Sequence, residues 1–145
     1  MWKLVSLSLV LLFALGMVTP AIAETMPFRF RALTNGVQHT FNMAQKAGGS
    51  DFENIAHFTV LRSVVMPNGT TATSNLVGGD QIDFRSVTTD YAYASRRVTA
   101  TRYGNPVTAD YLVGKAIANA SYYLGARTNP ESAHTNVRVA GQWTP

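Results

Sequence analysis

Residues 108–125 read TADYLVGKAIANASYYLG, and their interpretation decides between two fold classes. At a period of 3.6 residues the stretch is an amphipathic helix with a threonine cap at its first residue and a glycine stop at its last. The apolar stripe of that helix consists of Val113, Ala116, Ile117, Ala120 and Leu124. At a period of two, the even positions from 112 to 124 instead form a row that a strand buries, and Gly114 disfavours a helix by about 1 kcal/mol. We predict a helix over 109–124.

The segments on either side of this stretch have the alternation typical of strands. Phe28-Arg29-Phe30-Arg31 alternates apolar with charged residues, which predicts one buried and one hydrated face. Turn signals that contain glycine or proline separate the further apolar runs. The predicted strands are 28–31, 57–66, 70–73, 81–85, 91–103 and 136–143.

Two shorter helices are also compatible with the pattern, one over 40–47 and one after the capping box that Ser50 and Glu53 can form. Together these features predict an α+β fold, mostly antiparallel β-sheet with one helix near 109–124. The alternative is an all-β sandwich, in which residues 109–124 are not helical.

Residues 1–23 have the features of a secretory signal peptide. Lys3 provides the positive end, an apolar run follows, and Ala21-Ile22-Ala23 is a small-x-small cleavage site. The apolar run is too short and too interrupted for a membrane span. We therefore predict export to the periplasm or the medium, cleavage after Ala23, a single β-rich domain over 24–145, and no membrane span after cleavage.

Composition limits the function further. The chain has no cysteine, which excludes disulfide frameworks, zinc ribbons and thiol chemistry. After cleavage nine arginines and two lysines face eight acidic residues, a net charge of +3. This charge is too small for strong phosphate neutralisation at physiological salt, so specific nucleic-acid binding is not expected.

No catalytic or nucleotide-binding motif occurs in the sequence. His39, His57 and His134 are far apart along the chain and lack the spacing of a metal site, so neither a metal nor a cofactor is predicted. The enzymatic alternative is a small secreted nuclease or hydrolase in which His57, His134 and Glu53 are the acid and base.

Arginine and tyrosine provide the strongest functional signal. Along 91–103, Tyr93, Arg97 and Tyr103 alternate with serine and threonine on one predicted face. Arg85, Arg29 and Arg31 occupy outward positions on other predicted strands, so that a shared sheet would present a basic, aromatic surface.

We therefore favour an exported, non-enzymatic binding protein. Its partner on this reading is a glycan, an envelope polymer or another protein, because guanidinium groups and tyrosine rings suit anionic and hydroxyl-rich surfaces. A secreted antibacterial toxin or an enzyme inhibitor is a further alternative that the composition permits.

Overall fold

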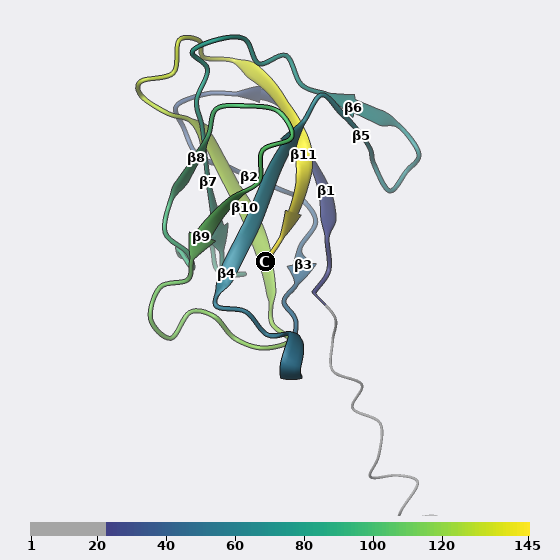
Figure 1. The fold of residues 1–145 in the computed structure, drawn as a ribbon, viewed down its shortest axis with the longest axis vertical. Coiled ribbons are helices and arrows are strands. Elements are labelled where there is room, and N and C mark those ends of the chain that lie inside the picture. The colour runs from purple at the N-terminus through teal and green to yellow at the C-terminus, as the bar shows by residue number, and fades with distance from the viewer. Residues whose placement is uncertain (1–22) are drawn as a thin grey trace, which may run out of the picture.

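The computed structural model describes residues 23–145, and nearly all of its regular structure is antiparallel β-strand (Figure 1). Sheet A has four strands, in the order β1 (Met26–Leu33), β11 (Val137–Thr144), β4 (Ile55–Leu61) and β9 (Val107–Asp110). Sheet B has the order β2 (Gln38–His39), β10 (Ser121–Thr128), β7 (Ile82–Val87) and β8 (Val98–Ala100), and β3 (Ala44–Gln45) also pairs with β10. A separate hairpin of β5 (Ser63–Val65) and β6 (Thr71–Thr73) projects from one side.

Aromatic side chains from both sheets form the core between them. The ring of Phe84 on β7 stacks on Phe58 of β4 with centroids 5.6 Å apart, and meets Phe28 of β1 edge-on at 5.5 Å. Trp143 on β11 stacks parallel to Phe58 at 6.3 Å. All four rings are almost fully buried, and each contributes about 2 to 3 kcal/mol through the apolar area it removes from water.

The predicted helix over 109–124 is wrong, and with it the α+β class. β9 ends at Asp110, β10 begins at Ser121, and turns connect them; the described residues contain no helix longer than the 3-10 turn η1 (Gly49–Asp51). Gly114 and Asn119 have left-handed backbone angles, φ 71° and 62°, which an α-helix does not accept. The all-β alternative describes this chain.

Only the last part of this stretch is a strand. Tyr122 and Leu124 of the period-two row are in β10 and are buried in the core, whereas Leu112, Val113 and Ile117 are exposed in the turns before it. The Tyr122 hydroxyl donates to the carbonyl of Lys115 at 2.6 Å and accepts from the amide of Ile117 at 2.9 Å. These two hydrogen bonds hold the turn segment against the end of β10.

Four other predictions are corrected. The segment 57–66 is divided between β4 and β5, since Arg62 interrupts it, and 91–103 contains only β8 and isolated bridges at Tyr93 and Ser95. No helix forms over 40–47, where β3 lies instead, and the capping-box region contains only η1. The strands predicted at 28–31, 70–73, 81–85 and 136–143 are present as β1, β6, β7 and β11, with bounds that differ by a few residues.

Residues 1–22 of the predicted signal peptide lie outside the described part of the chain, and cleavage stays a prediction. Within residues 23–145 the structure has no helix with the length and hydropathy that crossing a membrane requires.

Candidate functional site

The outer face of sheet B carries a cluster of three arginines. Phe84 and Leu124 point into the core, so the alternate positions on β7 and β10 face outward. Arg85 on β7, Arg127 on β10 and Arg97, directly before β8, line one shallow depression together with Asp83. Three neighbouring strands therefore place a net charge of +2 in one small area.

Asp83 holds this cluster together from beneath. Its carboxylate is only 2% exposed and accepts from Arg127 Nε at 3.1 Å, while Arg97 Nε lies 3.7 Å away. Its other oxygen accepts from Thr99 Oγ1 and from Asn129 Nδ2, each at 2.8 Å. A buried carboxylate with this many donors is fully satisfied, and it fixes the positions of two of the three arginines.

Arg85 is the arginine without a carboxylate. Its guanidinium carbon lies 3.8 Å from the ring centre of Tyr93, and it forms no salt bridge with any of residues 23–145. Burial, and then the neighbouring charge of Arg97, lower the pKa of Arg85. A guanidinium whose charged form is disfavoured by burial and by a neighbouring positive charge gains from an approaching anion.

An aromatic ladder borders the arginines. The rings of Tyr91 and Tyr123 stack at 5.3 Å, and His39 packs on Tyr91 at 4.9 Å. Tyr91 and Tyr93 are about half exposed. Gly125 of β10 lies next to these side chains. A Cβ at this position would come within 2.9 Å of the Val87 side chain, so the absence of a side chain lets the neighbouring groups lie close to the sheet.

We call the surface of Arg85, Tyr91, Tyr93, Arg97, Tyr123 and Arg127 the Arg–Tyr face.

Buried hydroxyls attach the segment before β8 to β7. The amide of Ser86 donates to Ser95 Oγ at 2.8 Å, and the Tyr111 hydroxyl donates to Ser86 Oγ at 3.2 Å. Ser95 is therefore buried and not on the hydrated row that the sequence predicts. Tyr93 and Arg97 lie on either side of this anchor and stay at the surface.

The remaining predicted binding residues lie elsewhere. Tyr103 is half-buried against the core, donates its hydroxyl to the carbonyl of Leu76 at 3.1 Å, and has the Arg62 guanidinium 4.6 Å from its ring centre. Arg29 and Arg31 are exposed on β1, which belongs to sheet A. Of the six predicted residues, the structure brings together Arg85, Tyr93 and Arg97.

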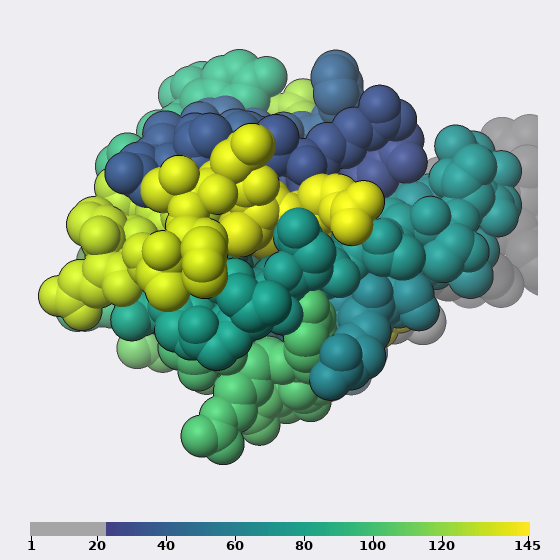
Figure 2. Space-filling model, turned by 90° about the horizontal axis from the view of Figure 1, so that it is seen from above, coloured from purple at the N-terminus to yellow at the C-terminus, as the bar shows by residue number. Residues whose placement is uncertain are grey.

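The candidate acid–base residues form two separate pairs. His57 Nε2 lies 2.9 Å from Glu53 Oε2 at the η1 end of the sandwich, and both side chains are exposed. His134 Nδ1 lies 2.8 Å from the buried Asp80, where the β10–β11 loop meets the β6–β7 loop at the opposite end (Figures 1 and 2). The second pair connects two loops, and the amide of Ala133 donates to the carbonyl of Gly79 at 2.9 Å beside it.

His39 joins neither pair, because its ring packs on Tyr91. Burial lowers the pKa of His39. Within residues 23–145 no three histidine, aspartate or glutamate side chains gather closely enough to hold a metal ion. The geometry therefore offers two acid–base pairs at opposite ends and one basic aromatic surface.

Arg127 and Tyr123 are not among the binding residues predicted from the sequence, because the prediction is a helix over 109–124 and no strand over 125–135. The alternation of Tyr123 and Arg127 with the buried Tyr122, Leu124 and Ala126 was the signal that could have indicated their hydrated position. No family model matches the chain, and neither a curated protein nor a solved structure matches it.

Proposed function

We propose that this chain is an exported, non-enzymatic binding protein that recognises an anionic glycan or envelope polymer through the Arg–Tyr face. The observation that carries the proposal is Arg85, which lies over the half-exposed ring of Tyr93 and has no carboxylate partner among the described residues. A guanidinium with free donors beside flat rings suits acidic sugars, whose carboxylates accept hydrogen bonds and whose ring faces stack.

The shape of the face supports an extended partner. The depression between the arginines has a volume of only about 10 Å³, which is close to the size of one water molecule. A compact small molecule needs a pocket of roughly 300 Å³ or more to bury most of its surface. A polymer can instead lie across the strands and contact several side chains at once.

The first experiment measures binding of polygalacturonate, a polymer with one carboxylate per sugar, by isothermal titration calorimetry. We expect the Arg85→Ala/Arg97→Ala double variant to bind about tenfold more weakly than wild type, because two charge-assisted contacts are lost. In this variant Asp83 still accepts hydrogen bonds from Arg127, Thr99 and Asn129, so we expect sheet B to stay folded.

The matched control is Arg102→Ala/Arg138→Ala, which removes the same charge from exposed positions outside the face. We expect it to bind nearly as well as wild type. Equal weakening by the two double variants, or equal binding of neutral dextran by wild type, would reject the Arg–Tyr face as a specific site. Binding of an isolated protein partner without polygalacturonate binding would favour the protein alternative.

A further inference from the structure

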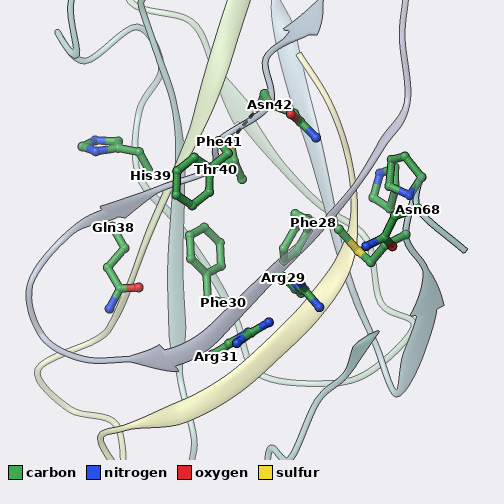
Figure 3. A pocket seen from close by; sticks show the side chains of 13 residues that line it. Phe28, Arg29, Phe30, Arg31, Gln38, His39, Thr40, Phe41, Asn42 and Asn68 are labelled. Carbon is green, nitrogen blue, oxygen red and sulfur yellow. Dashed lines mark hydrogen bonds between the residues drawn. The ribbon is translucent and has the colours of Figure 1, made fainter. Parts of the chain in front are cut away.

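A groove runs along the unpaired edge of a strand of sheet A, between this strand and the segment that contains β2 of sheet B. β1 is an edge strand of sheet A and pairs only with β11. A cavity of about 570 Å³ lies beside it, between Pro27–Arg31 and the segment Gln38–Asn42, with the turn of the β5–β6 hairpin at its end (Figure 3). The groove therefore lies where one more strand would extend sheet A.

The backbone of β1 has groups available on this side. Pro27 has no N–H, and a proline is accommodated in a strand on the edge that faces away from the neighbouring strand. Backbone groups alternate between the two edges, so the N–H and C=O of Arg29 point to the same free edge as Pro27. None of residues 23–145 has a backbone hydrogen bond to Arg29 from that side.

Two kinds of side chain border this edge. Phe28 and Phe30 point inward and form an apolar floor, whereas Arg29 and Arg31 point outward and are exposed. Neither arginine forms a salt bridge with a described residue. Phe41, which is fully exposed, stands on the opposite wall (Figure 3).

We propose that this groove binds an extended segment of another polypeptide, about five residues long, in which acidic and apolar residues alternate. The length follows from Pro27–Arg31, which spans roughly 16 Å at about 3.3 Å per residue. The apolar side chains of the guest would pack toward the phenylalanine floor and Phe41, and its carboxylates would lie beside Arg29 and Arg31.

The same charges argue against a second copy as the occupant. If two β1 edges paired with each other, Arg29 and Arg31 of one copy would face the same arginines of the other, and like charges directly opposite destabilise a strand pair. The proposal uses other charges than the Arg–Tyr face, because Arg29 and Arg31 are on β1 of sheet A and the arginine cluster is in sheet B. The two surfaces adjoin at His39, which lines the groove and packs on Tyr91.

The test is an NMR titration of the purified, isotope-labelled protein with a blocked pentapeptide of alternating glutamate and valine. We expect amide shifts at Arg29 and its neighbours, and loss of binding when all backbone nitrogens of the peptide are methylated. The Arg29→Glu/Arg31→Glu variant should bind this peptide at least about tenfold more weakly and should prefer a lysine–valine peptide. Both side chains are exposed, so its unfolding midpoint should equal that of wild type.

Arg85→Ala/Arg97→Ala is the control and should bind the pentapeptide as wild type does, which distinguishes this site from the proposed glycan site. The proposal is overturned if the shifts map to the Arg–Tyr face, if the methylated peptide binds equally, or if charge reversal does not reverse the preference. It is also overturned if the wild-type protein forms a dimer through β1 in sedimentation experiments.

Discussion

Arg127 Nε donates to the buried carboxylate of Asp83 at 3.1 Å, across the β7–β10 pair of sheet B. This contact positions an arginine at the surface through an acid beneath it, so the stability of sheet B and the charge of the Arg–Tyr face depend on one carboxylate. Asp83 neutralises one of three positive charges and leaves the face with a net charge of +2.

Asp83→Ala should lower the free energy of unfolding by about 3 kcal/mol, because it leaves Arg127, Thr99 and Asn129 without their acceptor. Urea denaturation followed by circular dichroism measures the change. The exposed carboxylate of Asp110 is the control, and Asp110→Asn should change stability by less than about 0.5 kcal/mol. Similar effects of the two substitutions would contradict the network.

Gly141→Ala should destabilise the protein by at least about 3 kcal/mol. A Cβ at this position of β11 would lie 2.0 Å from the backbone carbonyl oxygen of Thr59 and 2.8 Å from the Phe28 ring, so β4 and β1 would have to move apart. At Gly36 a Cβ meets only Thr34 Oγ1, at 3.7 Å, so Gly36→Ala should be nearly neutral. Thermal unfolding of the two variants compares them directly, and equal midpoints would be inconsistent with this packing.

Tyr122→Phe tests the turn segment that replaced the predicted helix. Without the hydroxyl, the carbonyl of Lys115 and the amide of Ile117 lose their partner, and we expect a loss of about 1 kcal/mol and faster hydrogen exchange at Ile117. Tyr123 is the matched control, since no described residue forms a hydrogen bond with its hydroxyl. If Tyr123→Phe accelerates exchange at Ile117 to the same extent, the two hydrogen bonds do not hold this segment.

We expect Lys46 to make the stability of the protein depend on pH. Its Nζ is buried 4.5 Å from the Tyr111 ring centre and donates to the carbonyl of Ile55 at 3.3 Å. Burial lowers the pKa of Lys46, an effect that the charge of Glu53 partly offsets. The unfolded chain therefore holds the proton at a pH where the folded protein has released it.

This difference in proton binding between the folded and unfolded states sets the direction of the pH dependence. The free energy of unfolding of wild type, relative to Lys46→Met, should increase as pH rises through the folded pKa toward the ordinary lysine value, and should be constant below that range. Denaturant titrations of both proteins at several pH values measure it. A relative stability that falls with rising pH would show that the charged lysine is favoured in the fold.

Strands with one buried and one hydrated face could be predicted from the sequence, and the turn segment between β9 and β10 could not. Phe28-Arg29-Phe30-Arg31 has only one compatible period, and it forms β1. In 109–124 the apolar residues satisfy both periods, and neither period extends through the whole segment in the structure. Tyr122 and Leu124 are buried in β10, whereas Leu112, Val113 and Ile117 are exposed in the turns, so tertiary contacts outweighed the local pattern.

The candidate site was predictable in part for the same reason. Arg85 and Arg97 were assigned to outward positions, and β7 and β8 are neighbours. Strand order decided the rest: Arg29 has the same alternation but lies on the other sheet, and Tyr103 is in a turn beside Arg62. The alternation of residues along one strand does not show which strands, distant in sequence, pair with each other. It therefore does not indicate which arginines lie on the same face of a sheet.

The most direct test of the Arg–Tyr face is an amide chemical-shift map of the labelled wild-type protein titrated with polygalacturonate. We expect the largest shifts at Arg85, Tyr93, Arg97 and Tyr123, with an affinity that falls as salt is added. Shifts confined to other surfaces, or none at saturating polymer, would contradict the assignment of binding to the outer face of sheet B.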